Sequence, residues 1–371
     1  MGVLERLNVG IVGAAGRGAS FRAAFDANSA TRIHAVCDVR ESLLDEAAEK
    51  LGASEKYTDY EEMLARSEVD AVVIGTPMQF HAPQAILALE QHIHVMSEVT
   101  AGVSVAECRD LVAAAGASRA VYMMAENYTY IKSNVLVREL ARWGLFGEVY
   151  YAEGEYLHEL KGLNEVTVWR RRWQTGIDGI TYGTHSLGPI LQWLQDDRVV
   201  RVCCEGSGHH YADPRGDAYE NQDTCVMMAK TGKGGLIKIR VDMLSERPHA
   251  MTNYALQGTR GCYESARSRG ERHRIWLADL CEDKNAWTDL MDLEADYMPD
   301  IWRNPPPDAL RAGHGGGDYF EVLDFVRCIV DGAPCPVGIH EAMDMTLPGL
   351  ISQASVQAGG AWMTVPDSRT W

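Results

Sequence analysis

The sequence predicts an α/β protein with two domains. Residues 1–125 should form a doubly wound domain with a parallel sheet, and residues 126–371 an α+β domain with an open, largely antiparallel sheet. Three observations predict this division. A chain of 371 residues is longer than most single domains. In its first third, short β-branched runs alternate with helical patterns, as in βαβ units. After about residue 126, runs typical of antiparallel strands follow one another.

The elements of the first domain follow from hydrophobic periodicity. Strands are expected at 7–13, 32–39, 69–76, 92–98 and 120–126, and helices at 20–28, 42–52, 83–91 and 105–116. Because a helix separates each strand from the next, right-handed crossovers should place these strands in parallel in one sheet.

The second domain should begin with a helix at 133–147. Strand patterns are found at 147–157, 198–208, 223–231, 234–244 and 252–265. Residues 178–194 are typical of a loop that enters a helix, and 304–319 of an irregular loop before a helix at 319–332. An open mixed sheet would accommodate these strands.

The composition argues against several partners. A formal net charge of −17 opposes binding to nucleic acid or to anionic membranes, which needs clustered positive charge. The chain has no run of 18 apolar residues and no signal-peptide pattern, so a cytoplasmic protein without a membrane partner is expected. The nine cysteines include no C-x-x-C pair, which indicates reduced thiols. No metal site is predicted even at His209, His210 and Asp213, because neighbours in sequence seldom converge on one ion.

A glycine-rich turn follows the first strand. In VGIVGAAGRGASF, Gly13, Gly16 and Gly18 lie between a strand and a helix start, where the backbone can approach a pyrophosphate and helix N–H groups are free. Ala15 stands at the second glycine position of the G-x-G-x-x-G pattern. On this motif alone, a glycine turn without a nucleotide is the alternative.

Two later strand ends favour a dinucleotide. Asp38 lies 20 residues after the last glycine of the turn, where a carboxylate can bind both ribose hydroxyls and repel a 2′-phosphate. NAD is therefore preferred over NADP, although Arg40 could stack on adenine or accept a phosphate. In VVIGTPMQFHAPQ, Thr76, Pro77 and His81 follow another strand and could line the cofactor.

These residues, in this order, resemble the Gfo/Idh/MocA oxidoreductase family over nearly the whole chain. That family has an N-terminal Rossmann domain and a C-terminal open α/β sheet that carries a sugar site. It typically has Glu-Lys-Pro at the end of the fifth strand and an Asp four residues before a His. Here the first motif reads Glu98-Val99-Thr100, and Thr181 lies four residues before His185. The paired loss suggests that other groups perform the proton chemistry. The expected cofactor residues are Gly13, Ala15, Gly16, Arg17, Gly18, Asp38, Arg40, Thr76, Pro77, His81 and Glu98.

A narrower resemblance supplies those groups. WRRRWQTGIDGITYGTHSLGPI is similar to the Trp-Arg-x-Arg stretch that leads into Tyr-x-Thr-His-x-Leu-Gly-Pro in glycoside hydrolase family 109, the NAD-dependent α-N-acetylgalactosaminidases. MMAENYTY, YYAEGEYLHEL, GHGGGDYF and SVQAGGAWMTVPDSRTW fit that group in the same order. The resemblance implies that Glu126, Tyr156, Tyr182 and His185 occupy active-site positions.

The resemblance also implies the chemistry. NAD takes hydride from C3 of the sugar, a base removes the C2 proton as the C1 substituent leaves, and water addition and re-reduction complete hydrolysis. We assign His185 to the C3 hydroxyl proton, Tyr182 or Tyr156 to C2, and Glu126 to orienting hydroxyls or water. The two tyrosine roles could be exchanged.

The expected substrate is a small hexopyranoside. The residues expected to bind it are Tyr128, His158, Trp169, Arg170, Arg171, Arg172, Trp173 and His314. Arg171 stands where family 109 typically has an apolar residue, and guanidinium groups match multi-oxygen anions. This favours an anionic glycoside such as a sulfoquinovoside, or else an α-N-acetylgalactosaminide; alternatively, the arginines form ion pairs within the acidic chain.

Two other functions remain open on the sequence. A plain NAD-dependent sugar dehydrogenase would use Tyr182 and His185 in place of the missing Lys and Asp. A non-catalytic NAD-binding protein would account for Val99. Family likeness favours a homodimer or homotetramer, and the anomer preference is not determined.

Overall fold

The computed structural model describes residues 6–216 and 219–371. The chain divides into two compact units. Met1–Tyr130, Pro305–Met343 and Ser368–Trp371 make up the first unit, and Ile131–Asn304 and Asp344–Asp367 the second. The first unit therefore includes segments from the last part of the chain.

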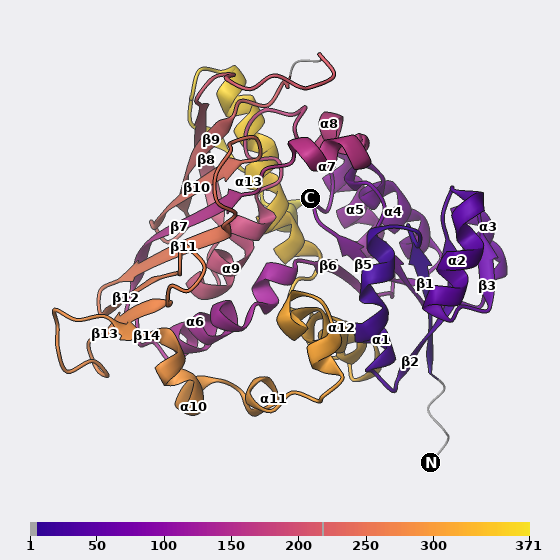
Figure 1. The fold of residues 1–371 in the computed structure, drawn as a ribbon, viewed down its shortest axis with the longest axis horizontal. Coiled ribbons are helices and arrows are strands. Elements are labelled where there is room, and N and C mark those ends of the chain that lie inside the picture. Colours follow the sequence, from indigo (N-terminus) through magenta and orange to yellow (C-terminus); the bar gives the residue numbers. More distant parts are fainter. Residues whose placement is uncertain (1–5, 217–218) are drawn as a thin grey trace. The chain divides into compact units, whose positions relative to one another are not determined.

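The first unit contains a parallel sheet with the strand order β3-β2-β1-β4-β5-β6 (Figure 1). The strands are β1 (Leu7–Val12), β2 (Thr31–Cys37), β3 (Glu55–Tyr57), β4 (Ala71–Ile74), β5 (His94–Glu98) and β6 (Tyr122–Ala125). β4 and β6 are buried along their whole length, as expected where helices cover both faces of a sheet. The predicted doubly wound parallel sheet is confirmed.

Helices connect these strands. They are α1 (Arg22–Asp26), α2 (Glu41–Leu51), α3 (Tyr60–Arg66), α4 (His81–Glu90) and α5 (Val105–Ala117). Asp59 accepts a hydrogen bond from the amide of Glu62, and Ser104 accepts one from the amide of Glu107. These N-caps fix where α3 and α5 begin. α12 (Gly317–Val330), from the late segment, packs against α1 and the turn Asn127–Tyr130.

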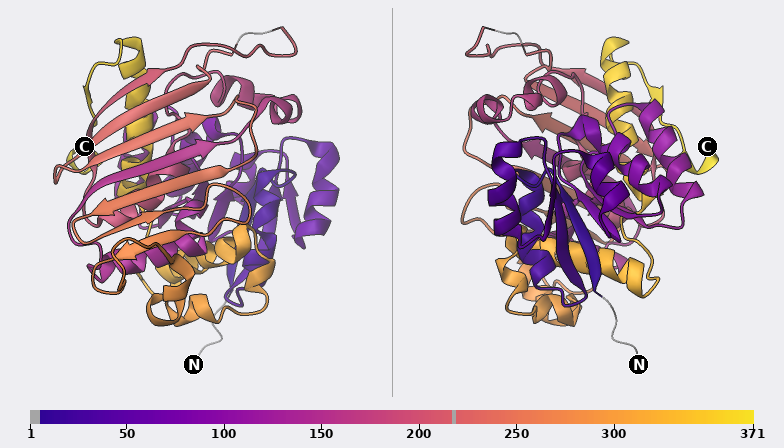
Figure 2. Two further views of the ribbon diagram at one scale, coloured as in Figure 1. Left: turned by 60° about the vertical axis from the view of Figure 1, so that its left-hand side comes forward. Right: turned by 90° about the vertical axis from the view of Figure 1, so that its right-hand side faces the viewer.

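The second unit contains a mixed sheet with the order β14-β13-β12-β11-β7-β10-β9-β8-β15 (Figure 2). Its strands are β7 (Val149–Leu157), β8 (Val199–Gly206), β9 (Thr224–Thr231), β10 (Leu236–Asp242), β11 (Met251–Gly258), β12 (Gly261–Glu264), β13 (Arg274–Leu277), β14 (Thr288–Asp289) and β15 (Met363–Thr364). β7 and β10 pair in parallel, and the other pairs in the described residues are antiparallel. The predicted open, largely antiparallel sheet is confirmed.

Two helices, α6 (Lys132–Arg142) and α9 (Thr184–Leu194), support this sheet. α9 packs on β7, β10 and β11, and α6 packs against α9. Gly154 allows the close approach, because a Cβ there would clash with the backbone oxygen of Ser186 on α9. The remaining helices are α7 (Lys161–Val166), α8 (Trp169–Trp173), α10 (Glu294–Tyr297), α11 (Asp300–Arg303) and α13 (Ile339–Gln357).

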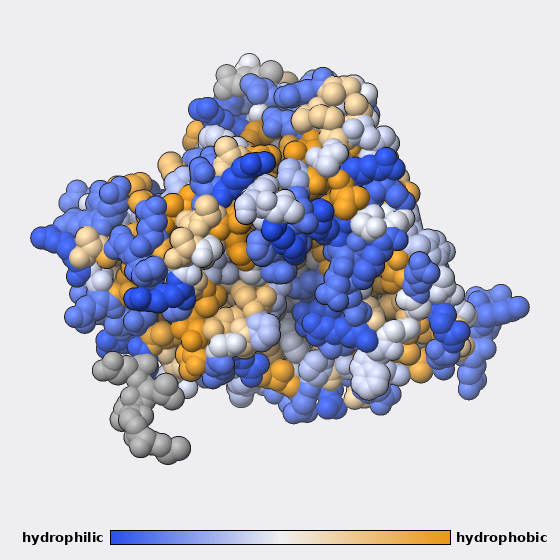
Figure 3. Space-filling model, turned by 180° about the vertical axis from the view of Figure 1, so that it is seen from behind, coloured by the Kyte–Doolittle hydropathy of each residue, from blue (hydrophilic) through white to orange (hydrophobic). Residues whose placement is uncertain are grey.

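Charged and apolar residues are mixed on the surface. On the face drawn in Figure 3, hydrophilic residues surround smaller apolar areas. Within the described residues, every helix is too short or too polar to span a lipid bilayer.

Candidate active site

The glycine turn of the first unit is packed against the end of β4. Gly13 has a φ of +76°, and a Cβ there would lie 2.7 Å from the backbone oxygen of Gly75. A Cβ on Gly18 would lie 2.8 Å from Ile11 Cγ2. Gly16 has more room, since the nearest atoms to its Cβ position lie at 3.6 Å. The turn therefore needs glycine at its two ends to bring the helix start close to the strands, as a dinucleotide site requires.

Asp38 lies directly after β2 and faces this turn. Its carboxylate accepts hydrogen bonds from the amide of Ala15 at 2.9 Å and from the guanidinium of Arg40 at 2.9 and 3.0 Å. Burial raises the pKa of Asp38, but these hydrogen bonds outweigh burial and lower it below its usual value. Arg40 thus pairs with the carboxylate, which is held ionised at the position suited to ribose hydroxyls.

His81 joins the loops that follow β4 and β5. Its Nε2 lies 2.8 Å from the backbone oxygen of Thr76, and its Nδ1 lies 2.9 Å from that of Thr100. Burial lowers the pKa of His81, so the ring is neutral and donates from one nitrogen. Pro77 precedes the short 3-10 turn that leads into α4. Both ring nitrogens of His81 therefore contact the protein backbone.

A buried carboxyl cluster surrounds Arg17. The guanidinium of Arg17 contacts Glu98 Oε1 at 2.6 Å. Burial lowers the pKa of Arg17, but Glu98, Asp318 and Glu321 raise it above its usual value. Glu321 is fully buried, and burial, Asp318 and Glu98 raise its pKa well above that of an ordinary carboxyl. Glu321 therefore holds its proton to a higher pH than an ordinary carboxyl does.

The other site residues of the first unit follow β6 or precede α12. Glu126 is buried and accepts a hydrogen bond from the amide of Tyr128 at 3.2 Å. Nδ1 of His314 lies 2.7 Å from Asp318 Oδ1, and its Nε2 lies 3.4 Å from Asn127 Nδ2. The rings of Tyr128 and His314 are 6.1 Å apart. Glu126, Tyr128 and His314 therefore belong to one neighbourhood.

In the second unit, three predicted catalytic residues gather. Tyr156 lies near the end of β7, His185 lies in the first turn of α9, and Tyr182 lies in the loop before α9. The Tyr156 ring is 5.5 Å from both the Tyr182 ring and the His185 ring, and Tyr182 and His185 are 5.4 Å apart. We call Tyr156, Tyr182 and His185 the Tyr/His cluster. It places polar aromatic groups at contact distance with little exposure of Tyr156 and His185.

His158 contacts this cluster. Its Nδ1 lies 2.8 Å from the hydroxyl of Tyr156. On its other side, its ring meets that of His249 edge to face at 5.2 Å. Burial, together with His249, Arg170 and His185, lowers the pKa of His158 to about 4. His158 is therefore uncharged at neutral pH.

The three consecutive arginines of α8 have different surroundings. Arg170 donates to Thr167 Oγ1 at 2.9 Å and to Gln174 Oε1 at 2.6 Å, and lies over the Trp169 ring at 4.5 Å. Arg171 forms an ion pair with buried Asp213 at 2.6 Å. The predicted alternative of internal ion pairs therefore holds for Arg171.

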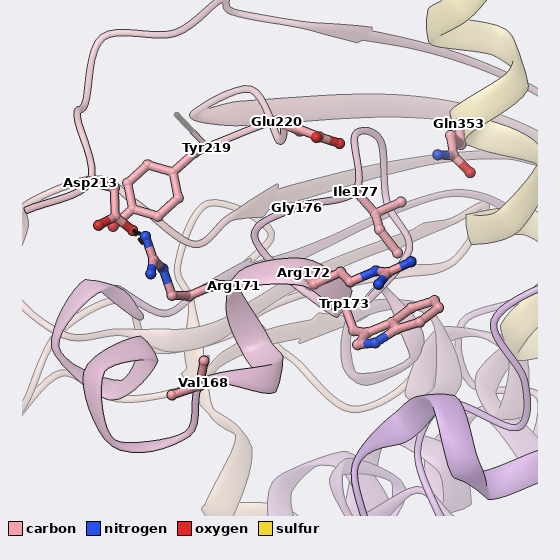
Figure 4. Close-up of a pocket in the computed structure, with 10 residues that line it drawn as sticks. All are labelled: Val168, Arg171, Arg172, Trp173, Gly176, Ile177, Asp213, Tyr219, Glu220 and Gln353. Carbon is pink, nitrogen blue, oxygen red and sulfur yellow. Dashed lines mark hydrogen bonds and ion pairs between the residues drawn. The ribbon is translucent and has the colours of Figure 1, made fainter. Parts of the chain in front are cut away.

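Arg172 lies over the ring of Trp173 at 5.2 Å and lines a pocket of about 670 Å³. Within the described part of the chain, no carboxylate lies within ion-pair distance of its guanidinium. Figure 4 shows Arg171 turned to Asp213 and Arg172 turned away, beside Trp173. The pocket also includes Ile177 and Gln353, together with the carboxyl residues Asp213 and Glu220. Arg172 therefore lines this pocket without an ion-pair partner in the described residues.

In residues 6–216 and 219–371, no group of three or more His, Cys, Asp or Glu side chains could hold a metal ion. His210 is hydrogen-bonded to Asp223 at 2.6 Å. The cysteines of the described residues are free thiols.

Sequence reasoning missed Asn127, His249, Asp318 and Glu321. Asn127 follows Glu126 directly, and Asp318 stands four residues after His314, across a non-helical glycine turn that brings the two side chains to 2.7 Å. These two spacings could have indicated both residues. Glu321 and His249 lie in ordinary helix and loop sequences and give no such signal.

Comparison with known proteins identifies the family. Residues 7–126 match the oxidoreductase family with an NAD-binding Rossmann fold. Residues 130–370 match the C-terminal domain of glycosyl hydrolase 109. The chain belongs to glycosyl hydrolase family 109. The predicted family, fold and NAD cofactor are thereby confirmed, and this family 109 protein is an NAD-dependent glycosidase.

Individual relatives agree. A glycosyl hydrolase family 109 protein of Saccharopolyspora erythraea is 31% identical over 392 residues, covering 98% of this chain and 83% of that protein. An alpha-N-acetylgalactosaminidase of Shewanella oneidensis is 28% identical and covers 98% of this chain and 85% of that protein. The solved structure of levoglucosan dehydrogenase with NADH and levoglucosan covers 98% of this chain and 100% of its own, at a TM-score of 0.82 and 19% identity. This last likeness concerns the fold.

Proposed function

We propose that this family 109 enzyme hydrolyses a small hexopyranoside by transient oxidation at C3, elimination across C1 and C2, water addition and re-reduction. The gathering of Tyr156, Tyr182 and His185 in one cluster carries the proposal. Bound NAD would supply a hydride acceptor at C3 and later return the same hydride. The net reaction is then hydrolysis, with no cofactor consumed. An ordinary glycosidase uses two carboxylates that flank the glycosidic bond, and NAD-dependent enzymes are an exception.

The cluster residues divide the proton transfers. We assign His185 to the C3 hydroxyl proton, because an imidazole can accept a proton near neutral pH. Oxidation at C3 acidifies the C2 proton, and Tyr156 or Tyr182 removes it. Glu126, in the first unit, would orient hydroxyls or water. Together these groups take over the work of the Lys and Asp that Val99 and Thr181 replace.

The substrate proposal has two supports. One relative is named alpha-N-acetylgalactosaminidase, which favours an α-N-acetylgalactosaminide. Arg172 lines a pocket without an internal ion pair in the described residues, which favours an anionic glycoside such as a sulfoquinovoside. The other residues proposed to contact the glycoside are Tyr128, His158, Trp169, Arg170, Trp173 and His314.

A sugar dehydrogenase is the second candidate. The structural likeness to levoglucosan dehydrogenase favours it, since the same fold there holds NADH and a sugar. A dehydrogenase would consume free NAD and accumulate a keto sugar.

Aglycone release separates the two candidates. The protein as purified, without added cofactor, is given a panel of aryl hexopyranosides that includes a sulfoquinovoside and an N-acetylgalactosaminide, while NADH absorbance is followed. Release without net NADH is expected. NADH that rises only when NAD and free sugars are supplied, with no release, would establish a dehydrogenase.

We also propose a homodimer or homotetramer that acts in the cytoplasm. Family resemblance supports this assembly. Sedimentation velocity would measure the assembly, and fractionation of the producing cells would test the location.

A further inference from the structure

The hydroxyl of Tyr156 lies between the Tyr/His cluster and His158. It is 2.8 Å from Nδ1 of His158, and the Tyr156 ring is 5.5 Å from the His185 ring. Tyr156 is 4% exposed, whereas His249, on the far side of His158, lies on the surface. The three side chains Tyr156, His158 and His249 therefore form a row from the buried cluster to solvent.

The charges around this row favour one protonation pattern. Burial is the main factor that disfavours a positive charge on His158, and His249, Arg170 and His185 add to its effect. Arg170, the permanently charged member of this group, would stabilise a negative charge on Tyr156, because the Tyr156 hydroxyl is adjacent to that imidazole. Because burial disfavours a phenolate on Tyr156, a neutral His158 that donates from Nδ1, with Arg170 nearby, is the arrangement that would offset this cost.

We propose that His158 is a positioning residue that deprotonates Tyr156 by exchanging tautomers, which makes Tyr156 the base for the C2 proton. Before the step, the hydroxyl of Tyr156 donates to unprotonated Nδ1, and Nε2 carries the ring proton. The Oη–H bond breaks as the Nδ1–H bond forms, and the Nε2 proton passes to His249 or to solvent water. The products are a phenolate, a neutral His158 that donates from Nδ1, and one proton released. Charge and atoms balance without an oxidant or a metal.

This proposal rests on the proposed glycosidase function and selects one of its two tyrosines. After the phenolate takes the C2 proton of the sugar, the same row connects that proton to solvent. Exchange through His158 and His249 should then replace it before C2 is protonated again. The isotope at C2 of the product sugar therefore shows whether protons exchange through Tyr156, His158 and His249.

A second tyrosine–histidine pair in this unit provides a matched control. The hydroxyl of Tyr263 lies 2.9 Å from Nδ1 of His273, and burial also lowers the pKa of His273. The rings of this pair are stacked, with centroids 6.1 Å apart. Besides burial, the group that acts on the pKa of His273 is the carboxyl of Asp289, which raises it. His273→Phe removes a similar hydrogen bond without touching the row.

The test is hydrolysis of an aryl hexopyranoside in D₂O, with the isotope at C2 of the product read by NMR. Wild-type protein and His273→Phe should give product that carries deuterium at C2. His158→Phe and His249→Gln should retain several-fold more protium, because the proton returns to C2 without exchange. His158→Asn keeps a polar group beside Tyr156 but cannot exchange tautomers, so it should resemble His158→Phe in this assay.

A pH profile of kcat/KM is the second readout. Loss of the Nδ1–H donor should make the phenolate of Tyr156 harder to form, so the acidic limb of His158→Phe should move up by about one pH unit, which is about tenfold in rate on that limb. The groups that face Tyr156 and His158 are Tyr182, His185, Arg170 and His249, and they are unchanged in that variant. His158→Asn should recover part of the shift through its amide donor.

The possible results distinguish a failure of the proposal for His158 from a failure of the glycosidase function on which it rests. If wild type and all four variants incorporate equal deuterium at C2, and the acidic limb of the pH profile of His158→Phe does not move, the proposed role of His158 is wrong. Failure of wild-type protein to release any aglycone would overturn the glycosidase function and, with it, this inference. Changed stability of His158→Phe alone cannot produce retained protium, since labelling is measured per product formed.

Discussion

The carboxyl cluster around Arg17 in the first unit and the Tyr/His cluster in the second unit differ in the charges of their side chains. In the first unit, Arg17 and Glu98 form an ion pair, and Glu321 is buried beside them with a raised pKa. In the second unit, Tyr156 and His158 are hydrogen-bonded, and burial, together with His249, Arg170 and His185, keeps the histidine neutral. An ion pair fixes which group carries each charge, whereas a tyrosine and a neutral histidine can each act as hydrogen-bond donor or acceptor. We infer that the first cluster supports a bound cofactor and the second performs proton transfer.

The strongest test of this comparison removes His185 from the second cluster. His185→Ala should lower turnover at least 100-fold, about 2.7 kcal/mol in the barrier, while NAD remains bound. Turnover is measured by aglycone release, and NAD binding by quenching of tryptophan fluorescence. His273→Ala serves as the control, because that histidine contacts Tyr263 away from the cluster. Near-normal activity of His185→Ala would remove it from the mechanism.

The sequence predicted the parts of the molecule that have local signals. Each of the longer strands of the parallel sheet is a run of apolar residues between two helical patterns, and the residues of the glycine turn are contiguous in the sequence. β3 and α3 were not predicted, because Glu55–Tyr57 is only three residues long and partly polar. α13 was also not predicted, since Pro348 and Gly349 within it are typical of a break.

The site was predictable only where its residues follow a motif. Tyr182 and His185 stand three residues apart, and a resemblance indicated both. The contact of Arg17 with Glu98 joins positions 81 residues apart, and Glu321 reaches that cluster from the far end of the chain. Such contacts form only when distant parts of the chain fold together, and no local sequence pattern at Arg17, Glu98 or Glu321 indicates them.

The first cluster can be tested through Glu321. At pH values between the ordinary carboxyl pKa and the raised pKa of Glu321, this carboxyl is ionised in the unfolded chain but keeps its proton in the folded protein. The contribution of Glu321 to stability is therefore greatest at low pH and falls as pH rises toward its raised pKa. Relative to Glu321→Gln, wild-type protein should lose up to about 1.4 kcal/mol of stability per pH unit above about pH 5.

Calorimetric unfolding between pH 4.5 and 8 measures this difference. Glu282→Gln, a change at an exposed glutamate, is the control and should follow wild type throughout. If Glu321→Gln also runs parallel to wild type, Glu321 is ionised in the folded protein. The contrast between fixed and exchangeable protons in the two clusters would then need another basis.

The smallest expected effect concerns two adjacent arginines of α8. Arg171 neutralises buried Asp213, whereas Arg172 faces the pocket beside Trp173. Arg172→Met should lower kcat/KM about five- to tenfold for an anionic glycoside, which is about 1 kcal/mol, and leave a neutral glycoside within twofold. Its melting temperature should not change. Arg171→Met should instead lower the melting temperature, because it leaves Asp213 buried without its partner. Equal losses on both glycosides in Arg172→Met would show that this guanidinium shapes the pocket without reading charge, and the substrate would then be sought among neutral hexosides.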